Sequence, residues 1–276
     1  MLKPNEIVHF YEVHDPISAR VASQTGFDFG WVSSLCVATS HGIRDSEELG
    51  PEHILDTCLQ LSSTSNLKLL VDGTNGFNSI EKLAYLIKRL EKIGALGIVI
   101  EDKAGVKNNS LQTGAQIGAT EGDFIEKIQA SLALRSRMLI VARLEGLIRG
   151  ESADAVYRRA RAAHEVGADA IFIHSNRDCF DHIQEVCHSI SGEIPVIVCP
   201  TTYPLPPSNL LLEHAIRGVI WANQGMRAAI RAQLEVAEHI RKYSSAPEEG
   251  LMSMKELFQF MDYEEISSLK SRFPRI

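Results

Sequence analysis

The sequence lacks the features that mark membrane, secreted and zinc-binding proteins. Among its 276 residues no apolar run approaches the length of a membrane span, and the N-terminal MLKPNEIVHFYEVHD has no signal-peptide core. The five cysteines occur singly, without CxxC spacing, which argues against a zinc site or a disulfide framework. We therefore expect a cytoplasmic protein with reduced thiols and no membrane partner.

Two further absences narrow the class of function. The net charge is −7 and the basic residues are scattered, so no basic patch predicts binding to nucleic acid. No GxGxxG motif follows the first expected strand, which weakens a dinucleotide-binding interpretation. The 45% of apolar residues suffice for a sizeable core. We expect one large α/β domain, residues 1–276, in which residues 244–276 form a C-terminal helical extension.

The chain repeats one unit. Short β-branched or aromatic apolar runs alternate with longer segments of helical periodicity, as in successive βα units of a parallel sheet. Eight runs are expected to be strands: Ile7–Tyr11, Phe27–Val32, Lys68–Val71, Gly97–Ile100, Met138–Ala142, Ala170–Ile173, Pro195–Cys199 and Gly218–Trp221. The expected helices are Ile17–Thr25, Pro51–Ser63, Ser79–Ile93, Glu121–Leu134, Ser152–Val166, Cys179–Ser191, Ser208–Ala215 and Gln224–Tyr243.

Eight such units in this length favour a closed (β/α)8 TIM barrel over an open doubly wound sheet. Gly26, Gly94 and Gly167 directly follow expected helices, as left-handed helix caps do. In this fold the chemistry lies at the carboxyl ends of the strands. Polar residues follow every expected strand: Glu12 and His14, Ser33 and Ser34, Asp72, Glu101 and Asp102, Arg143 and Glu145, His174 and Ser175, Thr201 and Thr202, and Asn223. We expect them to converge on one pocket.

The richest stretch is GIVIEDKAGVKNNSL, residues 97–111, in which a buried strand ends in two carboxylates and a polar loop follows. Asp72 and Glu101 are hard oxygen ligands without an HxxxH or cysteine cluster nearby, so Mg²⁺, with Mn²⁺ as the alternative, is favoured over zinc. The side chains expected to bind a phosphoryl or carboxylate group are Lys107, Asn109, Ser110, Arg143 and His174. These residues predict a small anionic substrate and a divalent cation.

Simpler structural interpretations stand beside these. An ion pair with Arg143 explains Glu145 at least as well as catalysis does, and Lys103 can be explained as a solvated side chain. Structural roles are favoured for Glu12 and His14. Loop capping would account for Thr201, Thr202 and Asn223, and packing for Cys36 and Cys199.

Several strings resemble the isocitrate lyase/phosphoenolpyruvate mutase superfamily, and within it the phosphoenolpyruvate mutases and phosphonopyruvate hydrolases. They are EVHDPISARVASQTGF, WVSSLCVATSHGIRDSEE, EDKAGVKNNSL, ARLEGLI, GADAIFIHS, PTTYP and GVIWANQGMRAAI. The resemblance runs from about Glu12 to the C-terminal SMKELF. It implies a barrel whose eighth helix is swapped between subunits, hence a homo-oligomer, dimer or tetramer, in which Gln224–Tyr243 or the segment after it packs partly on a neighbour.

The resemblance also implies residue roles. Ser33 and the backbone N–H groups of Ser34 and Leu35 would hold the substrate carboxylate or enolate oxygen. Asp72 would bind the metal directly, and Glu101 would hold a metal-bound water. Asp45 matches an aspartate near the transferring group. Lys107, Asn109 and Ser110 match a gating loop that covers the phosphoryl group. Arg143 and His174 match the side chains that clamp this phosphoryl group.

The loop distinguishes the activities within the family. Lyases of the superfamily resemble KKCGH here, with a catalytic cysteine, whereas this chain has KNNSL. The hydrolases usually carry threonine at the Asn109 position. The resemblance therefore implies an Mg²⁺-dependent isomerase of phosphonate biosynthesis that interconverts phosphoenolpyruvate and phosphonopyruvate. The substrate would be a small phosphorylated or phosphonate 2-oxo acid.

Three departures from the family pattern keep alternatives open. Thr74 stands where the family places a second aspartate near the metal, the loop reads KAGVK where an aromatic–proline pair is usual, and the first expected strand is not preceded by the family's leading helix. One alternative is a phosphonopyruvate hydrolase or a related phosphonate or 2-oxo-acid enzyme. Another is a catalytically impaired barrel that binds a small anion, for which Thr74 is the motivating residue.

Overall fold

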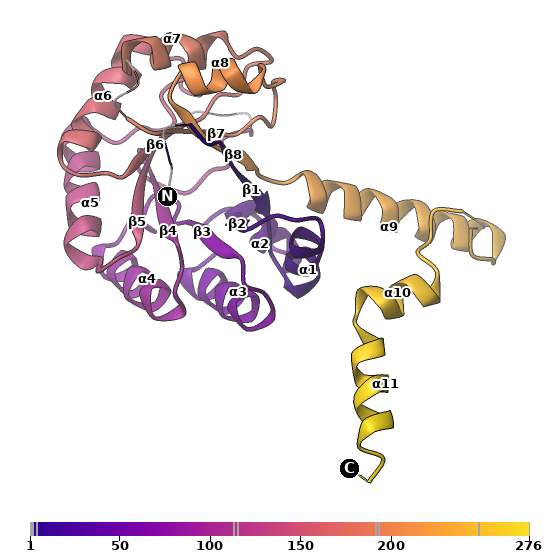
Figure 1. Cartoon of the computed structure of the whole chain (residues 1–276). Coiled ribbons are helices and arrows are strands. Elements are labelled where there is room, and N and C mark those ends of the chain that lie inside the picture. The colour runs from indigo at the N-terminus through magenta and orange to yellow at the C-terminus, as the bar shows by residue number, and fades with distance from the viewer. Residues whose placement is uncertain are drawn as a thin grey trace. The chain divides into compact units, whose positions relative to one another are not determined.

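The computed structural model describes residues 3, 5–112, 114, 116–190, 192, 194–247 and 249–275. It divides into two compact units, Met1–Met226 and Arg227–Ile276. The first unit contains a closed barrel of parallel strands that pair in chain order from β1 to β8 (Figure 1). This confirms the (β/α)8 prediction.

The strands lie within two residues of the expected runs. They are β1 Val8–Glu12, β2 Phe29–Val32, β3 Lys68–Asp72, β4 Gly97–Glu101, β5 Leu139–Leu144, β6 Ala170–Ile173, β7 Val196–Val198 and β8 Ile216–Trp221. The barrel closes where β1 pairs with β8, with Val8 opposite Gly218 and Tyr11 opposite Trp221. Asp72 and Glu101 are the last residues of their strands, so both lie at the carboxyl end of the barrel.

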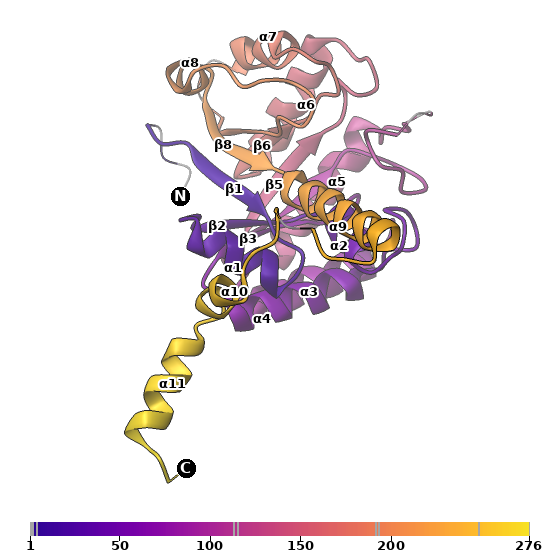
Figure 2. The same ribbon diagram turned by 90° about the vertical axis from the view of Figure 1, so that its right-hand side faces the viewer.

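Helices follow the strands and surround the barrel, as the ribbon views show (Figures 1 and 2). In the first unit they are α1 Pro16–Gln24, α2 Ser34–Ser40, α3 Pro51–Thr64, α4 Ile80–Ile93, α5 Glu121–Leu134, α6 Ala153–Glu165, α7 Asp181–Ile190 and α8 Ser208–Glu213, with the start of α9 Gln224–Tyr243. The expected end of α7 at Ser191 lies outside the described residues. Local signals define the ends of α4, where the Ser79 hydroxyl accepts from Lys82 N and Gly94 adopts a left-handed cap.

Helix α2 was not predicted. The helix is short. Its sequence also lacks a capping box, because no Glu or Gln stands three positions after the N-cap residue Ser33. The hydroxyl of Ser33 caps it by accepting from Cys36 N at 3.4 Å. Ser33 and Ser34 therefore mark the start of a helix, not merely a strand exit.

Two apolar layers hold the barrel together. Because successive strand residues point to opposite faces, one set fills the barrel and the other packs against the helices. The large side chains of the inner layer include Phe10, Trp31, Leu70, Phe172 and Ile220. With the interior filled by side chains, any ligand must bind at an end of the barrel.

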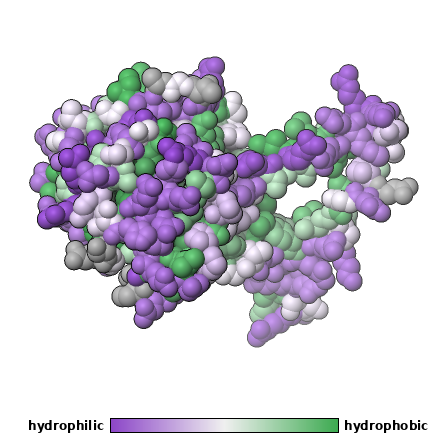
Figure 3. All heavy atoms as spheres, turned by 90° about the horizontal axis from the view of Figure 1, so that it is seen from above, coloured by the Kyte–Doolittle hydropathy of each residue, from purple (hydrophilic) through white to green (hydrophobic). Residues whose placement is uncertain are grey.

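The second unit contains the rest of α9 together with α10 Met254–Phe260 and α11 Tyr263–Arg272. No residue of α10 or α11 is buried, and hydrophobic groups lie among hydrophilic ones on the surface of these helices (Figure 3). Across the described residues, no helix is both long enough and apolar enough to span a bilayer.

Candidate active site

One pocket at the carboxyl ends of the strands collects all the predicted site residues. Its lining draws on seven of the eight strands, β2 to β8, either through the strand's own last residues or through the segment that follows it. The predicted residues in its wall are Ser33, Ser34, Leu35, Asp45, Asp72, Glu101, Lys107, Asn109, Ser110, Arg143 and His174. Side chains far apart in sequence thus meet at one mouth, as the strand-exit pattern predicted for most strands. Six residues of that pattern are not in this wall: Glu12, His14, Asp102, Glu145, Ser175 and Thr202. The roles of the individual side chains stay predictions.

Asp72 is fixed by its neighbours on both oxygens. Oδ1 accepts a hydrogen bond from Thr74 N at 3.0 Å, and Oδ2 accepts from Ser34 Oγ at 3.0 Å. Thr74 has φ +50°, a strained backbone for a β-branched residue, and its buried hydroxyl has no hydrogen-bond partner among the described residues. Strain and an unpartnered polar atom inside a pocket both indicate a functional position.

Glu101 is buried but only loosely paired. Its N–H donates to Thr74 O at 2.8 Å, while Oε2 lies 3.9 Å from both Lys103 Nζ and Arg143 Nε. Burial raises the pKa of Glu101 to about 7; Lys103 and Arg143 oppose the rise, and the Glu145 and Asp72 carboxylates add to it. A nearby cation would favour the ionised form.

Arg143, Glu145 and His174 form a tight buried cluster. Arg143 Nε donates to Glu145 Oε1 at 2.5 Å, and His174 Nδ1 lies 2.9 Å from the same oxygen and 3.0 Å from Arg143 Nη2. Burial alone would raise the pKa of Glu145, but Arg143 and His174 hold it well below its ordinary value. Burial lowers the pKa of His174 and thus favours the neutral ring. Both ring contacts use Nδ1, so a ligand in the pocket would meet Nε2.

Residues 103–111, which we call the gate after the loop that the family resemblance implies, form part of the wall of the pocket. Lys107 Nζ lies 2.5 Å from Asp45 Oδ1, and Asn109 Nδ2 donates to Asp45 Oδ2 at 2.7 Å. Burial would raise the pKa of Asp45, yet Lys107, Asn109 and Ser34 lower it overall. The gate is therefore attached to two carboxylates, Asp45 and Glu47, since Lys107 N also donates to Glu47 Oε1 at 2.7 Å.

Lys103 is the residue whose importance the sequence understated. It is buried, donates to Asn108 O at 2.9 Å and Ser110 Oγ at 2.7 Å, and has Nζ 3.8 Å from Glu145 Oε2. Its position directly after two strand-end carboxylates was the available signal, because a cation there balances charge at the barrel mouth. The simpler interpretation, a solvated lysine, is wrong.

The neighbouring carboxylate Asp102 points elsewhere. Its Oδ1 accepts from Glu145 N at 2.8 Å, and its Oδ2 accepts from Arg149 at 2.8 Å and Arg159 at 2.9 Å. Adjacent residues of an extended chain face opposite sides, so Glu101 faces the pocket while Asp102 fixes the end of β5, where Arg143 and the following Glu145 lie.

The residues after β7 and β8 divide between the pocket and its surroundings. Thr201, Asn223 and Cys199 line the pocket, and the amide oxygen of Asn223 is buried without a partner among the described residues. Thr202 caps a loop, since its hydroxyl donates to Arg177 O at 2.8 Å. Loop capping thus describes Thr202, but it does not describe Asn223.

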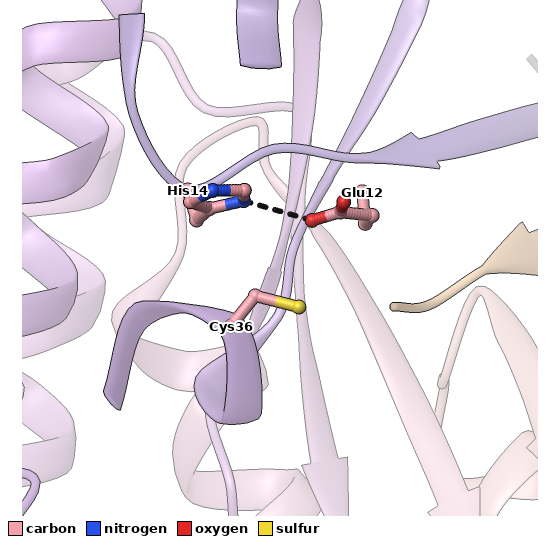
Figure 4. A group of neighbouring side chains, drawn as sticks. All are labelled: Glu12, His14 and Cys36. Carbon is pink, nitrogen blue, oxygen red and sulfur yellow. Dashed lines mark hydrogen bonds and ion pairs between the residues drawn. The ribbon is translucent and has the colours of Figure 1, made fainter. Parts of the chain in front are cut away.

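A second cluster lies where β1 ends. Glu12, His14 and Cys36 bring one ligand atom each to within 4.8 Å of one another, and the His14 ring points toward Glu12 (Figure 4). Both Glu12 oxygens already have partners, since Oε1 accepts from Met226 N at 2.6 Å and Oε2 lies 2.9 Å from His14 Nδ1. Burial raises the pKa of the Cys36 thiol, which disfavours the thiolate that metals bind. The cluster joins β1 to the start of α9.

The donor set around Asp72 and Glu101 fits a hard divalent cation. The pocket offers carboxylate and hydroxyl oxygens, which Mg²⁺ and Mn²⁺ prefer. Arg143 neutralises Glu145 at 2.5 Å but stays 3.6 Å from Asp72 Oδ2 and 3.9 Å from Glu101 Oε2. Two buried carboxylates without close ion pairs therefore have capacity left for a cation.

A closed parallel barrel whose strand ends carry paired carboxylates opposite anion-binding donors defines a (β/α)8-barrel enzyme site. The family model described as phosphoenolpyruvate phosphomutase matches residues 1–241. The chain belongs to this family, as the resemblance indicated.

Relatives and solved structures agree with this assignment. A phosphoenolpyruvate phosphomutase from Streptomyces hygroscopicus is 35% identical over 257 residues, which cover 91% of this chain and 82% of the relative. The crystal structure of phosphoenolpyruvate phosphomutase from Streptomyces platensis subsp. rosaceus matches with a TM-score of 0.90 at 28% identity, covering 98% of this chain and 95% of that one. A phosphonopyruvate hydrolase solved with oxalate and Mg²⁺ matches with a TM-score of 0.87 at 29% identity, covering 99% and 96%.

Proposed function

We propose that this chain is a phosphoenolpyruvate phosphomutase, an isomerase that interconverts phosphoenolpyruvate and phosphonopyruvate. The observation that carries the proposal is the meeting of Asn109, Arg143 and His174 in one pocket with Asp72 and Glu101. This pocket offers donors for a phosphoryl group beside carboxylates suited to a cation. An intramolecular transfer requires that the migrating phosphoryl group stay bound in place, and these three residues could restrain it.

The cation is proposed to be Mg²⁺, with Mn²⁺ as a substitute. Asp72 would hold it directly, and Glu101 would hold one of its waters. When bound, it supplies Lewis-acid stabilisation of the enolate charge that develops as the P–O bond breaks. The phosphonopyruvate hydrolase structure that contains Mg²⁺ supports this assignment.

The chain's own groups would bind and orient the rest of the substrate. The first N–H groups of a helix have no intrahelical acceptor, so Ser34 N and Leu35 N, with the Ser33 hydroxyl, would bind the carboxylate end. Arg143 would bind the phosphoryl oxygens bidentately, and His174 Nε2 and the Asn109 amide would limit where that group can move. The enolate carbon would then compete only with water for the phosphoryl group.

Exclusion of water from the pocket distinguishes the mutase reaction from the hydrolase reaction. Capture of the phosphoryl group by the enolate carbon gives phosphonopyruvate, whereas capture by water gives pyruvate and phosphate. The gate, held by Lys107 and Asn109 on Asp45, forms part of the wall of the pocket and supports exclusion of water.

Phosphorus NMR tests the reaction directly. With Mg²⁺ and phosphonopyruvate as substrate, we expect a phosphoenolpyruvate resonance to appear without equivalent inorganic phosphate. Inorganic phosphate and pyruvate would instead identify phosphonopyruvate hydrolase, the second candidate, which the structural match at a TM-score of 0.87 favours. Absence of both products with every metal tried would favour an anion-binding barrel, for which Thr74 is the motivating residue.

The cation site has its own test. We expect Asp72→Asn to weaken Mn²⁺ binding, followed by electron paramagnetic resonance, at least about 100-fold. The matched control is Asp56→Asn, which changes an exposed carboxylate on α3 and should bind Mn²⁺ as the native chain does. Equal affinities in both variants would remove Asp72 from the site.

A homo-oligomer, dimer or tetramer, and a cytoplasmic location complete the proposal. Met254 is 61% exposed, Tyr263 56% and Ile266 51%, and surfaces this apolar fit contact with a second copy of the chain. Light scattering at several concentrations would measure the assembly, and a monomer at all of them would contradict it. The five free cysteines fit a reducing compartment.

A further inference from the structure

The ring of Phe172 lies against the two side chains proposed to clamp the phosphoryl group. The guanidinium carbon of Arg143 lies over this ring, 5.0 Å from its centre, and the centre of the His174 ring lies 5.8 Å away. Phe172 is 1% exposed and lines the pocket. It is also the pairing partner of Arg143 where β5 meets β6, so the register of the barrel brings the ring and the guanidinium together.

The alternation of β6 explains why this ring faces the site. Ile171 and Ile173 belong to the apolar layer that packs against the helices, whereas Ala170 and Phe172 belong to the layer that fills the barrel. Trp31 from β2 meets the Phe172 ring edge to face, with ring centres 6.2 Å apart and an angle of 88° between the planes. A buried ring with such a neighbour has little freedom to turn, so it forms a rigid support.

The hydrogen bonds of Arg143 fix only part of its guanidinium. Nε donates to Glu145 Oε1 at 2.5 Å, and Nη2 donates to Ser110 Oγ at 3.3 Å and lies 3.0 Å from His174 Nδ1. Ser110 is itself proposed to bind the substrate, so a phosphoryl group competes with Arg143 for its hydroxyl. The contact with Phe172 uses none of the guanidinium N–H groups, so it persists when a ligand binds them.

We propose that Phe172 is a positioning residue for phosphoryl transfer, which acts through Arg143 and His174. The negative face of its ring attracts the guanidinium, and this attraction is strongest where water is excluded, as it is at these buried side chains. It would hold the two terminal nitrogens in the direction from which they bind the phosphoryl oxygens bidentately. The proposal rests on the proposed function, and it adds to the site a residue that supplies no hydrogen bond.

Fluorinated phenylalanines in place of Phe172 test this attraction with little change in packing, because fluorine withdraws negative charge from the face of the ring. With phosphonopyruvate and Mg²⁺, we expect kcat to fall with a trifluorinated ring and to fall further, at least about 10-fold, with pentafluorophenylalanine. KM should change less than about 3-fold, since charge attraction binds the substrate even when the guanidinium is tilted, whereas transfer depends on its direction. A ring with only a structural role would lower the free energy of unfolding and leave kcat unchanged.

A second measurement needs no substrate. Nitrogen NMR of a chain isotopically labelled at its arginine side chains reports how fast the Arg143 guanidinium rotates about its Nε–Cζ bond, and Arg143→Lys identifies the resonance. We expect pentafluorophenylalanine in place of Phe172 to speed this rotation at least about 10-fold. Phe172→Leu, which keeps an apolar side chain but has no aromatic face, should show the same fall in kcat and the same faster rotation.

The matched control is pentafluorophenylalanine in place of Phe124, a buried ring on α5 over which no cation lies among the described residues. This variant should keep the native kcat and the native rotation of Arg143. Near-ultraviolet circular dichroism would verify that each variant is folded. Native kcat or native rotation in either folded Phe172 variant would overturn the positioning role.

Turnover by the native chain separates the two possible failures. A native chain that consumes phosphonopyruvate, with Phe172 variants that match it, would overturn the positioning role alone. A native chain that consumes none with any metal tried would overturn the proposed function, and the rotation rate would then decide by itself whether Phe172 positions Arg143.

Discussion

Arg143 Nε donates to Glu145 Oε1 at 2.5 Å, and both side chains are buried at the mouth of the barrel. The pair fixes the guanidinium, while its Nη2 lies 3.0 Å from His174 Nδ1 and donates to Ser110 Oγ at 3.3 Å. Glu145 thus orients the proposed phosphoryl clamp and does not compete with it. The Arg143–Glu145 ion pair is therefore both a structural contact and part of the proposed phosphoryl clamp.

The first prediction concerns this pair. Arg143→Ala should abolish turnover and lower the free energy of unfolding by about 3 to 5 kcal/mol, because it leaves the Glu145 charge buried without its main partner. Urea denaturation would measure the loss. Arg143→Met combined with Glu145→Gln should regain most of the stability but no activity. An unchanged free energy of unfolding in Arg143→Ala would show that the pair carries little energy.

The second prediction concerns Asn109. Replacement by alanine should lower kcat about 100- to 1,000-fold, the usual effect of deleting one positioned donor, while the melting temperature stays within a few degrees. Turnover of phosphonopyruvate followed by phosphorus NMR gives the rate. Asn66→Ala, at an exposed position just before β3, should keep the native rate. Native turnover in both variants would exclude Asn109 from the reaction.

The third prediction concerns Thr74. Thr74→Asp should raise Mn²⁺ affinity at least about 10-fold, since a carboxylate ~5 Å from a divalent cation gains several kcal/mol of Coulomb energy before desolvation. Aspartate also tolerates the left-handed backbone at φ +50° better than threonine does. Thr74→Asn has the same shape without the charge and should bind Mn²⁺ nearly as the native chain does. If the two variants bound alike, charge at this position would not control affinity.

The fourth prediction concerns pH and Glu91, at the end of α4. Its carboxylate accepts backbone N–H groups from Ser136, Arg137 and Met138, which outweigh the effect of partial burial and lower its pKa to about 2. The ionised form is thus more stable in the folded state. The stabilisation is complete at neutral pH, begins to fall as pH drops through the ordinary value near 4.5, and is lost below about 2.

Glu91→Gln should therefore lower the free energy of unfolding at pH 7 by about 1 kcal/mol, a figure reduced for solvent screening of this partly exposed group. The difference from the native chain should shrink as the pH falls toward 3, as measured by urea denaturation at each pH. The control is Glu185→Gln, at an exposed position on α7. A difference that stayed constant with pH would contradict the assignment.

The strands and the longer helices could be predicted from the sequence because burial imposes a period on them. Strand β6 and helices α5 and α9 have the predicted bounds, because an apolar run or a helical periodicity locates each of them in the sequence. The pocket followed from topology, because parallel strands place all their carboxyl ends together. The residues that directly follow the strands supplied part of the wall, whereas Asp45, Lys107 and Asn109 lie in longer loops and were named from the family resemblance.

What the sequence could not supply was the direction and pairing of individual side chains. Lys103 was open to a solvated interpretation because burial of a lysine depends on carboxylates from other strands, such as Glu145 on the β5 exit. The Ser34 hydroxyl was missed because α2 is too short for a periodic signal. Attachment of the gate to Asp45 joins residues 64 apart, and no local pattern records such a contact.

The contact between Glu12 Oε1 and Met226 N joins residues 214 apart in sequence, and β1 can complete its pairing only with β8. During synthesis, β1 cannot complete its pairing until β8 has emerged from the ribosome. Until then, its edge is unpaired and open to association with other nascent chains. Expression should consequently depend on chaperones that shield that edge during the final stage of translation.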